Sequence, residues 1–355
     1  MEERNHPRGL AVLVGAAAFT IAMAGLHSIG GILGPAFLAI VLVITMYPIR
    51  IWLAKHKVPA PIASLVLLIS VYALLVLVSL ALVISIGRLA ALVPTYSDEI
   101  NGYIRDGGDF LAKQGVGQEQ INAITGAFDV GSLVGAATNI LQGILGVASD
   151  LFFVFTLLLF VAFDAAPTMR IMGSLDDRKP DFVVALRNFS TGVRQYMAVS
   201  AGFGFIVAGL DVAALWIMGV PGAFVWGVLS FVTNFIPNIG FVIGVVPPAL
   251  IALLEGGPGL MLAVIIVYTV INFVVQSVIQ PRIIGDQVGL SATLTFLSLV
   301  FWAFLIGPLG ALLAVPLSLL LKAVLVDADP SARWMLPLIS GKPGTPEQPG
   351  ESAKA

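Results

Sequence analysis

The sequence predicts an all-α, polytopic membrane protein with about eight membrane segments, including two Pro/Gly-broken helical hairpins in its C-terminal half. Two observations about composition predict this class: 58% of the 355 residues are hydrophobic, and only 11% are charged. A soluble domain carries about 25% charged residues. The third observation is that long apolar runs, two of them interrupted by proline and glycine, separate the charged segments.

The composition also limits the chemistry that we expect. The chain has no cysteine, and its three histidines are scattered, so no metal site is expected. No phosphate-binding loop and no nucleophile–base arrangement occurs, which predicts that the protein is not an enzyme and needs no cofactor. A net charge of −2 gives no indication of a nucleic-acid partner.

Residues 1–86 are expected to form three transmembrane spans, over residues 10–25, 32–49 and 62–86. The first two spans would turn near His27. An alternative for the first run is a signal peptide with a cleavage site at Ala22-Met23-Ala24. A second apolar run follows within a few residues, which favours a membrane hairpin.

Residues 87–146 have a different composition, with three basic and six acidic side chains. Pro94 and the Ser97-Asp98-Glu99 sequence indicate a helix start. We predict an extracytoplasmic helical insert here. Residues 147–195 would then hold a fourth span, over residues 147–163, and a cytoplasmic charged segment.

Basic residues predict the orientation. The segments 1–9, 50–57 and 164–195 carry ten of the eighteen Lys and Arg residues, and the predicted spans place all three on one side. The positive-inside rule then predicts cytoplasmic N and C termini.

The stretch from Phe224 to Leu254 is free of charge yet interrupted, first at Pro237-Asn238 and Gly240, then at Pro247-Pro248. Each arm around Pro237 has about 14 residues, roughly 21 Å at ~1.5 Å per residue, against a hydrocarbon core of about 30 Å. We expect a helical hairpin with its tip inside the membrane. Whether it crosses or turns back stays open.

The stretch from Ser291 to Leu321 repeats this pattern, with a break at Gly307-Pro308-Leu309-Gly310 and a further proline at Pro316. The predicted topology makes the two hairpins enter from opposite faces, as in inverted-repeat transporters, whose helix ends and unwound carbonyls hold the solute. We therefore predict a broken-helix transport domain over residues 196–325 and a flexible cytoplasmic tail over 326–355.

The predicted site lies between the two hairpin tips and is lined by polar and break-forming residues. The candidate substrate-binding residues are Asn234, Pro237, Asn238, Gly240, Gln276, Gly307, Pro308 and Gly310. Asp211, roughly 10 Å from the end of its span, is the candidate coupling carboxylate. Its alternatives are a contact with the outer interface or a helix cap. For Asn272, we expect a structural role, in which its amide forms hydrogen bonds between membrane helices.

Two segments resemble the autoinducer-2 exporter family of bacterial permeases. They are FVWGVLSFVTNFIPNIGFVIGVVPPALIAL (224–253) and QPRIIGDQVGLSATLTFLSLVFWAFLIGPLGALLAVPLSLLLKAVL (280–325). The resemblance implies a multi-pass protein of the bacterial inner membrane, a homo-oligomer, and export of a small polar signal. This chain departs from the family pattern at two places. Many relatives carry Glu and Asn just before the proline matched by Pro281, and this chain has Val275 and Gln276-Ser277 there. Many relatives also have a proline after the residues matched by Leu290-Ser291, and this chain has Ala292.

We therefore expect a secondary transporter that exports a small polar solute, with autoinducer-2 as the candidate and the solute and the lipid bilayer as its partners. One alternative is a sodium or lithium–proton antiporter that depends on Asp211. Another is a non-transporting membrane scaffold that binds a partner through residues 87–146.

Overall fold

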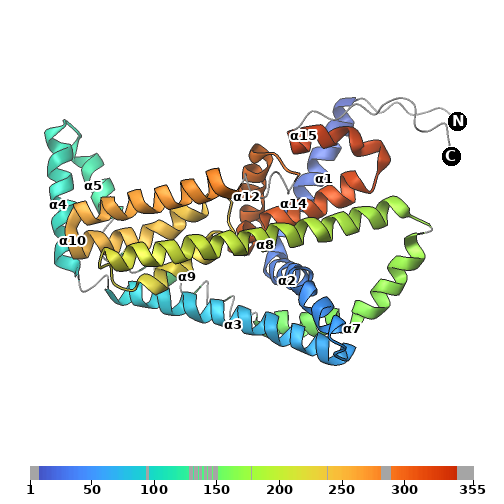
Figure 1. Cartoon of the computed structure of the whole chain (residues 1–355). Helices are drawn as coiled ribbons and strands as arrows, with labels where there is room; N and C mark the ends of the chain where they lie inside the picture. The colour runs from blue at the N-terminus through green and yellow to red at the C-terminus, as the bar shows by residue number, and fades with distance from the viewer. Residues whose placement is uncertain are drawn as a thin grey trace. The chain divides into compact units, whose positions relative to one another are not determined.

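The computed structural model describes residues 8–92, 96–127, 151–176, 178–237, 239–280 and 289–341, together with positions 131, 135, 138, 139, 142 and 146. These residues are almost entirely helical (Figure 1). The N-terminal helices are α1 (Arg8–Ser28), α2 (Gly30–Lys55), α3 (Ala60–Leu92), α4 (Ser97–Lys113), α5 (Gln118–Ala127) and α7 (Leu151–Asp176).

The C-terminal half follows with longer helices and short ones between them. These are α8 (Pro180–Ile217), α9 (Ala223–Thr233), α10 (Gly240–Asn272), the π-helix η2 (Phe273–Ile279), α12 (Ala292–Ile306), α13 (Pro308–Leu312) and α14 (Ala314–Lys322). The last elements are the π-helix η3 (Ala323–Asp327), the 3-10 helix η4 (Pro330–Met335) and α15 (Leu336–Ser340).

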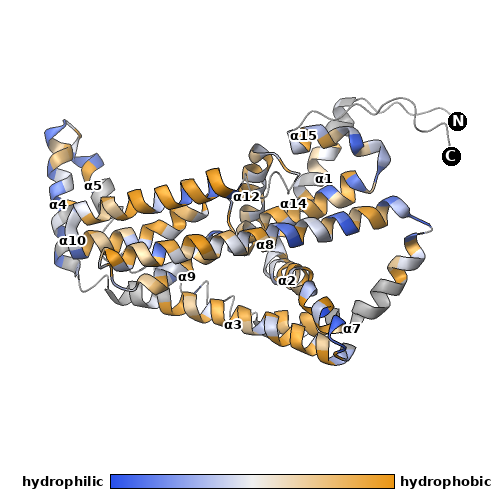
Figure 2. Ribbon diagram, in the orientation of Figure 1, coloured by the Kyte–Doolittle hydropathy of each residue, from blue (hydrophilic) through white to orange (hydrophobic). Residues whose placement is uncertain are grey.

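Four helical stretches of the described chain are long and apolar enough to cross a membrane: Gly30–Lys55, Pro61–Ile84, Pro180–Ile217 and Gly240–Ile279. Their apolar side chains are not all buried; Trp216 is 80% and Ile217 85% exposed. Figure 2 shows apolar residues along α3, α9 and α10, and more polar residues on α4. Large exposed apolar surfaces are stable where lipid replaces water, so the helices form a multi-pass membrane protein.

The chain folds into two compact units, each assembled from separate parts of the sequence. The first contains residues 1–45, 160–196 and 286–355; the second contains residues 46–159 and 197–285. The predicted transport domain, residues 196–325, is thus divided between the two units at about residue 285. Each unit is described by itself.

In the first unit, the turn between α1 and α2 packs on the end of α12. A Cβ added to Gly30 would lie 2.8 Å from the main-chain oxygen of Leu305, so only glycine fits this approach. The His27 ring stacks on Phe304, with Nδ1 3.1 Å from the Phe304 carbonyl oxygen. This contact fixes the N-terminal hairpin against the second interrupted stretch.

Several elements are longer than the sequence indicates. α7 continues to Asp176, and α8 begins at Pro180, so most of the charged segment 164–195 is helical. The tail expected to be flexible from residue 326 contains η4 and α15. The Arg333 guanidinium donates to Asp181 at 2.5 Å, and the Ser291 N–H to the Ile339 carbonyl at 2.8 Å, which fastens these helices to the unit.

Asp329 begins η4 in the manner of a helix cap. Its carboxylate accepts hydrogen bonds from the main-chain N–H and the hydroxyl of Ser331, at 2.9 and 2.8 Å. Both bonds favour the charged form and hold the pKa of this exposed carboxyl below its usual range.

In the second unit, α9 and α10 form the first interrupted stretch, and we name residues 234–239 the first break. A Cβ added to Gly240 would lie 1.9 Å from the Thr233 carbonyl oxygen. The start of α10 therefore rests directly on the last turn of α9, an approach that only glycine permits.

The expected interruption at Pro247-Pro248 is wrong, because α10 continues through both prolines. The proline φ of about −65° suits a helix, and neighbouring helices compensate for the lost N–H group. The chain instead leaves helical geometry at Gly257, with φ 74° and ψ −173°, a conformation that favours glycine. Helical limbs on both sides of this bend contribute to one core cluster, Val245 and Ala249 from one, Tyr268 from the other.

The second interrupted stretch, in the first unit, has a matching glycine contact. We name residues 307–313 the second break. α12 ends at Ile306, its C-cap Gly307 has a φ of 76°, and a Cβ added to Gly310 would lie 1.9 Å from the Trp302 carbonyl oxygen. Gly240 and Gly310 thus perform the same packing role in their own units.

We predict that Gly240→Ala and Gly310→Ala each lower the free energy of unfolding by about 1–3 kcal/mol, because the added methyl group overlaps a main-chain oxygen. The control is Gly202→Ala on α8, where no atom lies within 4 Å of the added Cβ. Thermal unfolding of the purified full chain in detergent checks this. Unchanged melting of the first two variants would show that the close contacts do not exist.

Candidate functional site

A chain of hydrogen bonds between amide side chains lies beside the first break, and we name it the amide ladder. Asn234 Nδ2 donates to the Ser200 carbonyl at 3.0 Å, and Gln276 Nε2 donates to Asn234 Oδ1 at 2.8 Å. Gln276 Nε2 also donates to Asn272 Oδ1 at 2.8 Å, and Asn272 Nδ2 to the Tyr268 carbonyl at 2.9 Å. The ladder therefore joins α8, the end of α9, and the junction of α10 with η2.

Local structure positions each amide. Asn234 is the C-cap of α9, so its side chain leaves the helix where the first break begins. Gly204 on α8 makes room for it, since a Cβ there would lie 2.8 Å from Asn234 Nδ2. Gln276 lies within the π-helix η2, a form of helix that is rare and frequent at functional sites.

The ladder leaves one acceptor unused. Gln276 Nε2 makes two hydrogen bonds, while its Oε1 has no hydrogen-bond donor within reach among the described residues. Both Asn234 and Gln276 are only partly buried. A partly accessible amide oxygen, on a side chain held by two other amides, could accept a hydrogen bond from an uncharged polar solute.

Fewer main-chain N–H groups of the first break are free to bind a solute than the sequence analysis expected. The N–H groups of Asn234, Phe235, Ile236, Ile239 and Gly240 all donate to nearby main-chain carbonyls, at 2.7–3.2 Å. These five N–H groups are therefore not free to bind a solute, while the expected role of the unwound carbonyls stays a prediction. The polar side chains next to the break are further candidates for hydrogen bonding.

Asp211 is fully buried in α8, with 0% of its surface exposed. The Ser230 hydroxyl on α9 donates to its Oδ2 at 2.5 Å. The coupling role of Asp211 and its two alternatives, contact with the outer interface and a helix cap, stay predictions.

The other predicted site residues fall as follows. Asn234 and Gln276 are in direct contact, whereas Pro237 and Gly240 belong to the first break and its packing contact. Gly307, Pro308 and Gly310 belong to the second break, in the other unit. Asn238 lies outside the described residues, and the meeting of the two breaks stays a prediction.

Sequence reasoning missed four participants: Ser200, Gly204, Ser230 and Tyr268. Ser200 takes part through its main chain, which leaves no mark in the sequence. Ser230 could have been noted because it lies four residues before Asn234, and Gly204 because small residues allow close approach between membrane helices. Tyr268 could have been noted as a polar group four residues before Asn272.

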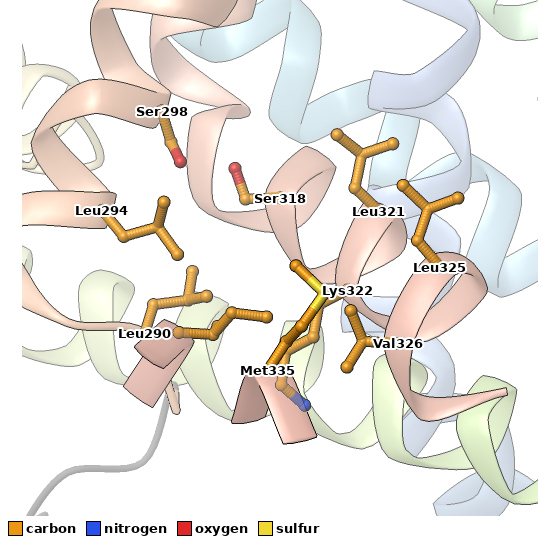
Figure 3. Close-up of a pocket in the computed structure, with 10 residues that line it drawn as sticks. Leu290, Leu294, Ser298, Ser318, Leu321, Lys322, Leu325, Val326 and Met335 are labelled. Carbon is orange, nitrogen blue, oxygen red and sulfur yellow. The ribbon is translucent and has the colours of Figure 1, made fainter. Parts of the chain in front are cut away.

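Cavities lined by described residues lie elsewhere. The first unit has one of about 420 Å³ lined mostly by leucine and other apolar side chains, with the Ser298 and Ser318 hydroxyls at one end (Figure 3). Lys322 also lines it, but its ammonium is paired with Asp327 at 2.8 Å. A cavity of about 390 Å³ lies between α3 and the start of α9. No three potential metal-binding side chains gather in the part of the chain that the structure covers.

Comparison with known proteins identifies the scaffold. Residues 10–328 match the family described as AI-2E family transporter. The AI-2 transport protein TqsA of Escherichia coli is 27% identical over 89% of this chain and 92% of its own length. A putative transport protein of Haemophilus influenzae is 29% identical over 91% of this chain and 94% of its own, and YhhT of E. coli, also a putative transport protein, is 26% identical over 94% and 96%.

A family of transporters agrees with the membrane helices and with the absence of catalytic motifs in the sequence, and it favours transport over the scaffold alternative. The match covers both interrupted stretches and nearly the whole chain. The protein is a membrane transport protein, not an enzyme, and it belongs to the AI-2E transporter family.

Proposed function

We propose that this protein is a secondary transporter that exports a small, uncharged polar solute, with AI-2 as the candidate. The observation that carries the proposal is the amide ladder beside the first break, with the free Oε1 of Gln276. The name of the E. coli relative supports AI-2 as the solute to test first.

The neutral lining favours an uncharged solute. No described side chain of the ladder is ionisable, and the amides supply both donors and acceptors. A hydroxyl or carbonyl group of a solute would pair with Gln276 Oε1 or with the amide N–H groups, and so replace part of its hydration. In the proposed complete site, Pro237, Asn238 and Gly240 of the first break face Gly307, Pro308 and Gly310 of the second.

Asp211 is the proposed coupling carboxylate. Its burial also favours the second candidate function, a sodium or lithium–proton antiporter, because an intramembrane acid often takes part in cation movement. Asp211→Asn separates the two: an antiporter loses cation–proton exchange, and a solute exporter keeps solute binding.

The proposed setting is the bacterial inner membrane, with both termini in the cytoplasm, residues 87–146 outside, and several copies of the chain assembled as a homo-oligomer. The distribution of Lys and Arg supports the orientation. The family resemblance supports the assembly.

We predict that Gln276→Leu weakens AI-2 transport at least about tenfold, because it removes the free acceptor and two ladder bonds of about 1 kcal/mol each. The measurement is the concentration dependence of AI-2 efflux from proteoliposomes containing the full chain. Thermal unfolding of each variant shows whether a loss reflects folding.

The matched control is Gln280→Leu, the same substitution one turn further along and outside the ladder. We expect AI-2 efflux close to wild type. Wild-type efflux by a well-folded Gln276→Leu protein would refute the amide site; equal losses in both variants would also count against it.

We predict a second result for the orientation, using the chain's natural lack of cysteine. Gln114→Cys, in the exposed turn after α4, should react with a membrane-impermeant maleimide in intact cells. Arg178→Cys, in the exposed turn before α8, should react only after the inner membrane is opened. The reverse pattern would invert the proposed topology.

A further inference from the structure

The Asp211 carboxyl has an unusual environment. Ser230 donates to Oδ2, but Oδ1 has no hydrogen-bond partner within the described chain. The ion pairs found there, Arg187–Asp176, Lys322–Asp327 and Arg333–Asp181, all involve other side chains. A fully buried carboxyl is thus held by a single hydroxyl.

Within the described parts of α8, α9 and α10, no charged side chain pairs with this carboxyl. The other charged residues of α8, Asp181, Arg187 and Arg194, precede it by at least 17 residues, about 25 Å along an α-helix. α9 contains no charged residue. Glu255 of α10 is exposed and accepts a hydrogen bond from Tyr96.

Tyr268 of α10 is a second buried titratable side chain in this unit, in the core cluster that also contains Leu215, one turn after Asp211 on α8. It is fully buried, and its hydroxyl has no hydrogen-bond partner within the described residues. A phenol can donate to a carboxylate or accept from a protonated carboxyl, so its chemistry suits either form of Asp211.

A proton is the ion that suits this position. An ionised carboxylate without a partner is very unfavourable in an apolar interior, and protonation removes the charge. Neither cavity described above is lined by Asp211, and a proton needs no cavity. The proton would form an O–H bond at Oδ1 and leave to water when the site opens.

One helical turn connects Asp211 to the amide ladder. The Ser230 hydroxyl holds the carboxyl, and the Ser230 carbonyl accepts from the Asn234 N–H at 3.0 Å and from the Thr233 hydroxyl at 3.2 Å. Asn234 begins the ladder through its side chain. A change in the Ser230–Asp211 bond therefore acts on the residue that positions Gln276.

We propose that Asp211 binds and releases a proton and that Ser230, a positioning residue, transmits its protonation state to the amide ladder through the last turn of α9. This inference rests on the proposed function and specifies how solute binding is linked to protons. Deprotonation gives Oδ2 a negative charge, and a charge-assisted hydrogen bond is shorter and stronger. The last turn of α9 then shifts toward α8, and Asn234 with it.

The first test detects the proton directly and needs no solute. Infrared spectra of the full chain in lipid nanodiscs are recorded across a pH series for wild type, Asp211→Asn and Ser230→Ala. We expect a protonated-carboxyl C=O band in wild type that is absent from Asp211→Asn and shifted to higher frequency in Ser230→Ala, since a hydrogen bond is lost. A protonated-carboxyl C=O region that is the same in wild type and Asp211→Asn at every pH would overturn the proton site.

The same spectra test whether Ser230 transmits the protonation state of Asp211 to the amide ladder. Side-chain amide bands that disappear in Gln276→Leu should change in wild type at the pH where the carboxyl band is lost. In Ser230→Ala, the carboxyl should still titrate while these amide bands stay constant. Amide bands that change with pH equally in both proteins would overturn the role of Ser230.

The last test uses AI-2 efflux from proteoliposomes over the same pH series. The rate of wild-type efflux should change over the same pH range as the intensity of the carboxyl band. Ser230→Ala should retain efflux, with a rate that varies by no more than about twofold over the pH series. The control is Ser298→Ala, another buried serine, in the other unit, which should keep the wild-type profile. A wild-type profile in Ser230→Ala would overturn the inference. If wild type moves no AI-2, the proposed function fails, and the spectra alone decide the inference.

Discussion

A chain that leaves its helix inside an apolar segment must satisfy its peptide groups within the protein, because lipid offers no hydrogen bonds. Both interrupted stretches meet this constraint by close approach. Gly240 rests on the Thr233 carbonyl and Gly310 on the Trp302 carbonyl, each too close for any side chain. The first break also binds its own N–H groups. The glycines thus allow the two helix ends at each break to pack in direct contact.

Beside the first break, the second unit holds two groups of polar side chains. Asn234, Gln276 and Asn272 form one group, and Asp211 with Ser230 forms another. The last turn of α9 belongs to both. A membrane protein pays heavily for each polar group that it buries, and two such groups joined by one turn are difficult to explain as helix packing alone.

The sequence predicted the broad architecture because a long uncharged run has few stable alternatives to a membrane helix. Gly307 was visible as a break because glycine adjoins proline. Pro247-Pro248 misled, because proline's φ suits a helix whose neighbours supply the missing support. The Asn234–Gln276 contact was predictable only as two amides in apolar surroundings. The geometry of this contact depends on the Ser200 carbonyl, on the absence of a side chain at Gly204 and on the π-helix η2. None of these has a clear sequence signature.

The π-helix η2 has one consequence for how related chains are compared. Each π turn holds more residues than an α turn, so the wider turn behaves as an insertion absorbed within the helix. Removing a single residue between Phe273 and Ile279 would restore ordinary α-helical winding and rotate Gln276 away from Asn234. A one-position gap at this point of an alignment therefore marks a changed polar lining, whereas the same gap in a surface loop leaves it intact.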